Sequence, residues 1–380
     1  MERDIETQCL HLNDKDQQME QLGAVSYPIY QTATFARTAV GEGSGYDYSR
    51  LQNPTREHLE KIVAQLEGGI DAIAFTSGMA AISAMMELFK PGDHLIVDED
   101  LYGGCVRLLQ NISKKNGIIF SSINCSKESI KEHINKNTKA VFVETPTNPM
   151  MNVVDISELV STAHAKNVKV IVDNTFLTPY FQNPLKLGAD IVVHSGTKYL
   201  GGHNDTLAGM LVTADEQIAE SLRFISKTTG ANLAPFDSWL MIRGIKTLSI
   251  RMEKAQKNAI IIAKWLETRE NVKKVIYPGL ETHPEYAIIK KQSRGVGAMI
   301  TFAVTDKDTA LAILKNVNLI QFAESLGGTE TLLTYPITQT HADVPDKELS
   351  RRGVTDKILR LSVGIEAVTD LIDDLEKAGL

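Results

Sequence analysis

The stretch Ile191-Val192-Val193-His194-Ser195-Gly196-Thr197-Lys198 places an apolar, strand-like run directly before two hydroxyl side chains and a lysine. At the end of a buried strand, a lysine loses part of its hydration, which lowers its pKa and lets it form a Schiff base with an aldehyde. The hydroxyls of Ser195 and Thr197 could bind a phosphate beside it. A lysine after a strand is more often a solvated loop charge, so this interpretation needs support from elsewhere in the chain.

That support comes from a second apolar run, Val170-Ile171-Val172, which ends in the carboxylate of Asp173. Pyridoxal 5′-phosphate requires both groups, because a lysine binds its aldehyde and an acid keeps its pyridine nitrogen protonated as an electron sink. The alternative is that Asp173 caps a helix or forms a turn. With Lys198 on the next strand-like segment, we favour the cofactor interpretation.

Short apolar runs alternate with helical patterns between residues 56 and 213. This alternation is typical of an α/β fold with a mainly parallel sheet that is covered by helices on both faces. Ligands bind such sheets at the carboxyl ends of the strands, where we expect Asp173, Ser195 and Lys198. The apolar runs lie at 72–75, 94–97, 118–120, 140–143, 170–172, 191–193 and 207–212.

The chain divides into three parts by its pattern. Residues 1–55 have few periodic apolar positions and are expected to form an N-terminal arm, and residues 56–245 are expected to form the cofactor-binding domain. A helical pattern from about Pro235 to Arg269 is expected to connect this domain to a smaller α+β domain within 246–380. In that smaller domain we expect a strand over 297–304 and a helix over 306–315.

Composition limits the classes of partner. The 380 residues carry a net charge of -7 without a basic tract, which argues against nucleic acid and anionic membranes as partners. The three widely spaced cysteines, Cys9, Cys105 and Cys125, suggest a reducing compartment rather than a disulfide framework. Neither a signal peptide nor an apolar run of ~20 residues is present, so we expect a cytoplasmic protein. No metal site is expected.

A phosphate site is suggested where the run ending at Phe75 turns through Ser77-Gly78 into a helix that begins near Met79. The start of a helix offers N–H groups and a partial positive charge, and a glycine lets the backbone approach an anion closely. The alternative is that the Ser-Gly pair only caps the helix.

Motifs along nearly the whole chain together resemble the cysteine/methionine-metabolism (trans-sulfuration) family. This resemblance implies the type I, aspartate-aminotransferase-like fold of pyridoxal 5′-phosphate enzymes, with a seven-stranded, mainly parallel sheet and a smaller C-terminal α+β domain. The motifs are Tyr48-Ser49-Arg50, Asn53-Pro54-Thr55, Ser77-Gly78-Met79, Tyr102-Gly103-Gly104, Glu144-Thr145-Pro146-Thr147-Asn148-Pro149, Asp173-Asn174-Thr175, Ser195-Gly196-Thr197-Lys198, Glu324-Ser325-Leu326-Gly327-Gly328 and Leu359-Arg360-Leu361-Ser362.

The resemblance also implies roles for the matching residues. Lys198 would bind the cofactor and move the substrate Cα proton, Asp173 would pair with the pyridine nitrogen, and Tyr102 would stack on the ring. Tyr48 and Arg50 would reach the cofactor phosphate of a neighbouring subunit, which implies a homodimer that is usually paired into a homotetramer. Without the resemblance, Tyr102 could be a core aromatic and Arg50 a surface ion pair. The other phosphate-binding candidates are Ser77, Gly78, Met79, Ser195 and Thr197; the catalytic candidates are Lys198, Tyr102 and Tyr48.

Four residues are candidates for substrate binding. Arg360 lies in an apolar run, and a buried guanidinium needs an anion. By resemblance this anion is the substrate α-carboxylate, with Ser325 and Asn148 assisting, whereas the alternative is an internal partner such as Glu366. Glu324 resembles the acid that lies near the distal amino group of cystathionine or near incoming cysteine, and its alternative is a solvated carboxylate.

The reaction is expected to be γ-replacement, in which cysteine or another thiol replaces the acyl group of an O-acylhomoserine. Segments 235–240 and 334–343 resemble bacterial cystathionine γ-synthases that also act as O-acetylhomoserine thiolyases, while Leu51-Gln52 departs from the usual Ser-Gly. Elimination by a cystathionine γ-lyase or β-lyase is the close alternative. Gly104 stands where methionine γ-lyases usually carry a cysteine, which disfavours that activity. The alternative outside the enzymes is a non-catalytic regulatory protein that binds the cofactor.

Overall fold

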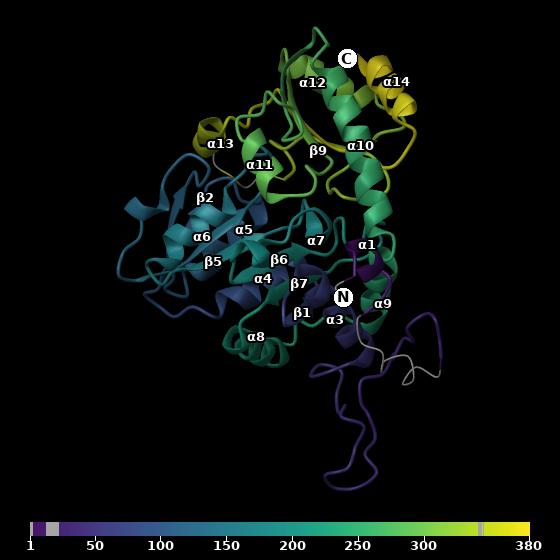
Figure 1. Cartoon of the computed structure of the whole chain (residues 1–380). Coiled ribbons are helices and arrows are strands. Elements are labelled where there is room, and N and C mark those ends of the chain that lie inside the picture. The colour runs from purple at the N-terminus through teal and green to yellow at the C-terminus, as the bar shows by residue number, and fades with distance from the viewer. Residues whose placement is uncertain (1–2, 13–22, 341–343, 345) are drawn as a thin grey trace.

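The computed structural model describes residues 3–12, 23–340, 344 and 346–380. Its two sheets lie one beyond the other, and the long helix α10 (Leu248–Leu266) runs beside both (Figure 1). The arm projects away from the rest of the chain at the end opposite the C-terminus.

The larger sheet has seven strands in the order β1-β7-β6-β5-β4-β2-β3. Strands β2 to β6 are parallel to their neighbours within that group, and only β7 runs antiparallel, between β1 and β6. The prediction of a mainly parallel seven-stranded sheet is therefore confirmed. The strands are β1 (Asp71–Phe75), β2 (His94–Asp98), β3 (Ile119–Ile123), β4 (Thr138–Glu144), β5 (Lys169–Asp173), β6 (Ile191–Ser195) and β7 (Gly209–Thr213).

Helices cover both faces of this sheet because alternate residues of each strand point to opposite sides. On β6, Ile191 and Val193 belong to the core under α4, α5 and α8, while Val192 belongs to the core under α3. Helix α6 covers the same face as α3, farther along the sheet. The helices and short turns of this part are α3 (Pro54–Glu67), α4 (Gly78–Met86), α5 (Gly103–Leu108), η1 (Leu109–Ser113), η2 (Ile130–Glu132), α6 (Ile156–His164), α7 (Thr178–Phe181), η3 (Pro184–Leu187) and α8 (Glu216–Thr229).

The expected helix between Pro235 and Arg269 is two helices, α9 (Pro235–Ile245) and α10. The break lies at Lys246 and Thr247, where the N–H of Thr247 donates to the carbonyl of Gly244 in a tighter turn than an α-helix has. The periodic apolar pattern continues across the break because both helices pack on the same core. Periodicity alone therefore did not reveal it.

The second sheet has five strands in the order β10-β11-β12-β9-β8. Strand β9 (Met299–Val304) and helix α12 (Lys307–Asn316) confirm the expected strand and helix, and the side chain of Asp306 caps α12 through the N–H of Thr309. The other elements are β8 (Val272–Ile276), α11 (Tyr286–Gln292), β10 (Gln321–Phe322), β11 (Leu332–Thr334), α13 (Asp346–Arg352), β12 (Ile358–Ser362) and α14 (Val368–Ala378).

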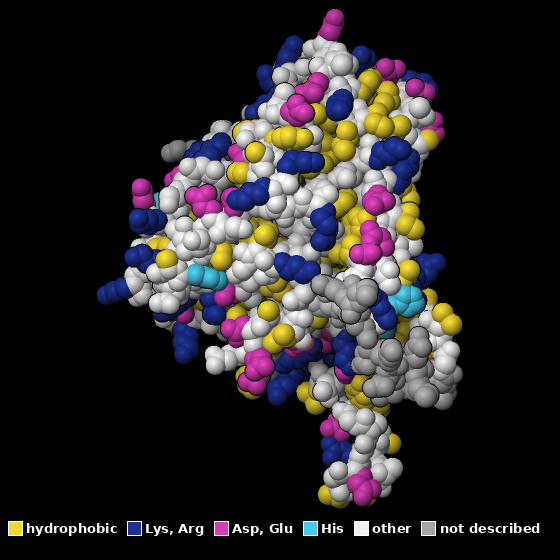
Figure 2. All heavy atoms as spheres, in the orientation of Figure 1, with side chains coloured by type: hydrophobic (Ala, Val, Ile, Leu, Met, Phe, Trp, Pro, Cys, Tyr) yellow, Lys and Arg dark blue, Asp and Glu magenta, His cyan; other side chains and the backbone are white. Residues whose placement is uncertain are grey.

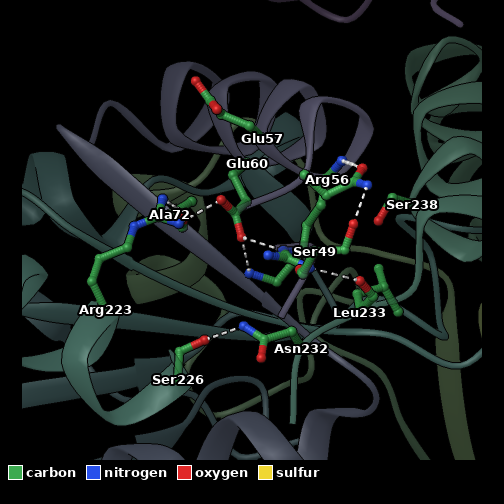
Figure 3. A network of polar contacts seen from close by, with 12 residues as sticks. Ser49, Arg56, Glu57, Glu60, Ala72, Arg223, Ser226, Asn232, Leu233 and Ser238 are labelled. Atoms are coloured by element: carbon green, nitrogen blue, oxygen red, sulfur yellow. Dashed lines mark hydrogen bonds and ion pairs between the residues drawn. The ribbon is translucent and has the colours of Figure 1, made fainter. Parts of the chain in front are cut away.

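The base of the arm is held by a buried polar network. Figure 3 shows Glu60 between Arg56 and Arg223, with Oε2 of Glu60 2.6 Å from Nη1 of Arg223. Arg56 donates to the carbonyls of Ser49 (2.7 Å) and Leu233 (3.4 Å). A buried carboxylate between two guanidiniums is well compensated, so this network fixes where the arm leaves the domain. The short helix α1 (Ile5–Gln8) packs on α3.

Candidate active site

A cavity of about 200 Å³ lies at the carboxyl ends of β4, β5 and β6, between the two sheets. It shares Thr197, Leu207, Glu324 and Ser325 with a larger outer cavity of about 850 Å³. The inner cavity brings together the predicted site residues Ser77, Gly78, Met79, Tyr102, Asn148, Asp173, Ser195, Thr197, Lys198, Glu324, Ser325 and Arg360.

Lys198 follows the end of β6, and its amine donates a hydrogen bond to the hydroxyl of Ser325 at 2.9 Å. Burial lowers the pKa of the Lys198 amine to about 8; the charge of Arg360 lowers it further and that of Glu324 raises it. A neutral amine is the form that attacks an aldehyde, so this environment favours covalent chemistry. Ser325 has a φ of 132°, a conformation that favours glycine and is often found where a site constrains the backbone.

Asp173 ends β5 beside Glu144, which ends β4 in the same register. Its Oδ1 accepts hydrogen bonds from the N–H (3.0 Å) and hydroxyl (2.5 Å) of Thr175. Burial raises the pKa of Asp173. Burial also raises the pKa of Glu144 to well above its usual range, and the nearby charge of Asp173 raises it further. Among the described residues, no ion pair involves either carboxylate. A positively charged ring nitrogen would supply the missing partner.

Glu144 was not predicted as a site residue, although its sequence position carries a signal. Like Asp173, it ends an apolar strand at the carboxyl edge of the sheet. Its Oε2 accepts a hydrogen bond from the N–H of Tyr102 at 3.1 Å. Glu144 therefore anchors the backbone of an aromatic residue that lines the cavity.

The start of α4 faces the end of β6. A Cβ atom on Gly78 would lie 2.9 Å from Cβ of Ser195, so only glycine allows this close approach. The hydroxyl of Ser77 caps α4 by accepting from the N–H of Ala80 at 3.0 Å. The first N–H groups of a helix have no partner within it, so the start of α4 and the hydroxyls of Ser195 and Thr197 are suited to bind an anion.

These groups fit pyridoxal 5′-phosphate. One cavity is lined by the start of α4, by the Lys198 amine of lowered pKa, and by the Asp173 carboxylate, which forms no ion pair with the described residues. They match the phosphate, the pyridine nitrogen and the aldehyde of that molecule in charge and chemistry.

Arg360 lies on β12 and is fully buried. It donates to Oδ1 of Asn148 (2.8 Å), the carbonyl of Ser325 (2.9 Å) and the hydroxyl of Thr334 (3.1 Å). All three are neutral, and burial lowers the pKa of Arg360 to about 10. Its Nε has no hydrogen-bond partner among the described residues. A buried cation without an anion favours a carboxylate from a bound substrate.

The internal alternative, Glu366, forms no ion pair or hydrogen bond with Arg360. Its carboxylate instead accepts from the N–H (2.6 Å) and the hydroxyl (2.8 Å) of Thr331. The alternative of an Arg360–Glu366 pair is therefore wrong.

Gly104 leaves room for the ring of Tyr102. A Cβ atom at position 104 would lie 2.5 Å from Cε1 of Tyr102 and 3.1 Å from the sulfur of Met79. A cysteine there would displace the ring. The neighbouring Cys105 is buried, and burial raises the pKa of its thiol well above the ordinary value, so it is a poor nucleophile.

Tyr48 and Arg50 do not line the cavity of their own chain. Nη1 of Arg50 donates to the carbonyl of Lys227 at 2.5 Å, and its guanidinium lies 5.5 Å from the centre of the Tyr48 ring. Tyr48 is 44% exposed. Their predicted role requires a second copy of the chain. Of the motif 338–343, positions 341–343 lie outside the described residues.

The described ranges contain neither a metal-binding cluster nor a membrane-spanning helix. No group of three or more histidine, cysteine, aspartate or glutamate side chains there is arranged to hold a metal ion. None of the helices in those ranges has the length and apolar character needed to cross a bilayer.

Known proteins resemble this chain in sequence and in structure. Residues 6–379 match the family model of Cys/Met metabolism PLP-dependent enzymes. The chain is 46% identical to a cystathionine beta-lyase of Lactococcus lactis subsp. cremoris, over 94% of each chain. It is 45% identical to a cystathionine gamma-synthase/O-acetylhomoserine (thiol)-lyase of Bacillus subtilis, over 100% of this chain and 97% of that one. A crystal structure of cystathionine gamma-lyase from Lactobacillus plantarum complexed with L-serine superposes with a TM-score of 0.94 at 39% identity, over 99% and 98% of the chains.

Proposed function

Because the chain belongs to the family of Cys/Met metabolism PLP-dependent enzymes, we propose that it catalyses γ-replacement on an O-acylhomoserine. The sulfur of cysteine, or of another thiol, bonds to Cγ, and the bond between Cγ and the acyl oxygen breaks. With O-acetylhomoserine and cysteine, the products are cystathionine and acetate. The observation that carries this proposal is an inner cavity with Lys198 and Arg360 that joins a large outer cavity, whose charged side chains among the described residues are all acidic.

Arg360 orients the first substrate. Its guanidinium binds the substrate α-carboxylate from the floor of the inner cavity, where Asn148 and Ser325 fix its position. A buried, two-pronged donor suits a carboxylate in both charge and shape. The Cα of the substrate is thereby directed toward Lys198, which lines the same cavity.

Lys198 is the proton carrier of the site. The cofactor, when bound, withdraws electrons from the substrate and makes its Cα proton acidic. The Lys198 amine, held by Ser325, takes that proton and returns it on the same side. Tyr102 would stack on the cofactor ring, and Asp173 would keep the ring nitrogen protonated.

The outer cavity accommodates the second substrate. Asp205, Asp237, Glu324 and Glu330 line it, and no described lysine or arginine does. An acidic cavity attracts the ammonium group of cysteine and lies next to the position of Cγ. The sequence similarity to a γ-synthase with thiolyase activity, over the full length of this chain, supports the same assignment.

Elimination from cystathionine is the second candidate function. Its support is the 46% identity to a protein named cystathionine beta-lyase and to another, from Bacillus subtilis, named cystathionine gamma-lyase. The acidic outer cavity would bind the distal ammonium of cystathionine equally well, so the site residues keep their roles in either reaction.

A second copy of the chain is proposed to complete the site. The arm within residues 1–55 presents Tyr48 and Arg50 at its surface, and a guanidinium is suited to a phosphate. Apolar side chains gather on the surface along α10, where Ile250 and Ile261 are 69% and 38% exposed (Figure 2). A homodimer as the minimum active unit, paired into a homotetramer, would cover such a surface.

All three cysteines are free and buried, which supports a cytoplasmic location.

Product analysis tests the proposed reaction. The cofactor-loaded protein is incubated with O-acetylhomoserine with and without cysteine, and separately with cystathionine alone, and products are followed by mass spectrometry. Cystathionine as the dominant product of the first mixture supports γ-replacement. Release of 2-oxobutanoate or pyruvate from cystathionine, without synthesis from O-acetylhomoserine, would assign the lyase reaction instead. Formation of no product in any mixture would favour a non-catalytic cofactor-binding protein.

A further inference from the structure

A buried pair of hydrogen-bonded side chains, Glu67 and His194, lies behind the active-site strands. Glu67 is the last residue of α3, is fully buried, and has no basic residue in the last turn of its helix. A carboxylate at the negative end of a helix dipole is unfavourable without a cation. Nε2 of His194, also fully buried on β6, lies 2.6 Å from Oε1 of Glu67. Since side chains alternate along a strand, His194 points to the α3 side, away from the cavity face of Ser195.

Glu67 is linked to the strand that carries Asp173. The side-chain N–H₂ of Asn174, the next residue after Asp173, donates to Oε1 of Glu67 at 2.9 Å and to the carbonyl of Gln182 at 2.8 Å. The side chain of Gln182 returns a hydrogen bond to Oδ1 of Asn174 at 3.0 Å. Glu67 therefore holds the end of β5 from the α3 side of the sheet, opposite the cavity.

His194 is linked to Asp173 by a second route. The N–H of Ser195, which directly follows His194, donates to the hydroxyl of Thr175 at 2.8 Å. The same hydroxyl donates to Oδ1 of Asp173. Glu67 and His194 are thus connected to the Asp173 carboxylate in two ways, through Asn174 on one side and through Ser195 and Thr175 on the other.

The charge of His194 would also favour the ionised form of Asp173. Glu144 stands beside Asp173 in the sheet, and two buried carboxylates disfavour each other's ionised form. The charge of His194 is the opposing influence, and it lowers the pKa of Asp173 against the rise caused by burial. A carboxylate that pairs with a protonated ring nitrogen has to be ionised.

The pair is poorly built for stability alone. Nδ1 of His194 and Oε2 of Glu67 have no hydrogen-bond partner among the described residues. Buried ion pairs with incomplete hydrogen bonding contribute little net stability, and apolar side chains of similar volume often replace them without loss. A role in the function of the neighbouring site accounts better for two buried ionisable side chains at this place.

We propose that Glu67 and His194 form a positioning pair that holds the Asp173 carboxylate in place and ionised for the pyridine nitrogen of the cofactor. The inference rests on the proposed role of Asp173. Neither residue touches the cofactor or the substrate, so both act through Asn174 and Thr175.

The experiment compares E67Q and H194Q with D173N and with a matched control, H94N. His94 is a buried histidine of the same sheet that binds Thr138 (2.8 Å) and Ser121 (3.0 Å) and does not line the cavity. For each variant three quantities are measured: the dissociation constant of pyridoxal 5′-phosphate, the ¹⁵N chemical shift of its ring nitrogen in the loaded protein, and the melting temperature.

For E67Q and H194Q we expect cofactor affinity to fall about tenfold, which corresponds to ~1.4 kcal/mol, and the ¹⁵N shift to move toward unprotonated pyridine. H94N should lower the melting temperature without changing the other two quantities. If E67Q and H194Q retain the affinity and ring-nitrogen shift of the native protein while D173N loses both, the positioning pair is refuted and the proposed function stands. If D173N also leaves both unchanged, the assignment of Asp173 and this inference fall together.

Discussion

Replacing Arg360 by lysine tests the proposed binding of the α-carboxylate. The guanidinium has fixed positions for its donors because Asn148, Ser325 and Thr334 hold it from the protein side. A lysine keeps the charge but offers a single point donor, so one charge-assisted hydrogen bond to the substrate is lost, worth roughly 1.5–3 kcal/mol. We therefore expect kcat/KM for O-acetylhomoserine to fall about 10- to 150-fold in R360K.

The assay compares O-acetylhomoserine with its carboxamide analogue. In the native protein the carboxylate should be strongly preferred, and in R360K this preference should shrink by about the same factor as kcat/KM. The matched control is R251K. Arg251 is only 5% exposed and donates to the carbonyls of Tyr199 and Gly244. Its replacement should reduce the melting temperature and leave the preference unchanged. A carboxylate preference that survives in R360K would refute the assignment.

Three further predictions concern single positions. E324Q should raise KM for cysteine several-fold and leave KM for hydrogen sulfide unchanged, because the exposed Glu324 carboxylate attracts an ammonium group that sulfide lacks; equal effects on both would contradict this. G104A should lower kcat and change the absorption spectrum of the bound cofactor, because the added Cβ meets the Tyr102 ring at 2.5 Å; an unchanged spectrum would show that the ring does not stack on the cofactor. The pKa of Lys198 is lowered to about 8, so its amine is protonated below that pH and neutral above it. The rate at which cofactor-free protein captures pyridoxal 5′-phosphate should rise with pH through 8 and then level off, whereas a rate still climbing toward pH 10.5 would indicate a lysine of ordinary pKa.

Sequence patterns were most informative where strands are buried on both faces. The uninterrupted apolar runs before Asp173 and Lys198 located the carboxyl edge of the sheet, because such runs suit only strands covered on both sides. That edge is where most candidate site residues meet. The division of the chain near residues 55 and 245 stays a prediction, because one hydrophobic core contains residues from all three predicted parts.

Features that depend on contacts between distant residues could not be read from the sequence. Glu67 and His194 meet only because α3 packs across β6, and Glu144 becomes a neighbour of Asp173 only through the register of β4 and β5. The break between α9 and α10 was hidden because both helices bury apolar residues against one core.

The proposed chemistry depends most directly on Lys198, the residue to which we expect the cofactor to be covalently attached. The most direct test is to reduce the cofactor-loaded protein with borohydride, digest it, and locate the pyridoxyl group by mass spectrometry. We expect the label on Lys198, at about one group per chain, and no label on K198A. A label on another lysine in the native protein, or full labelling of K198A, would contradict it.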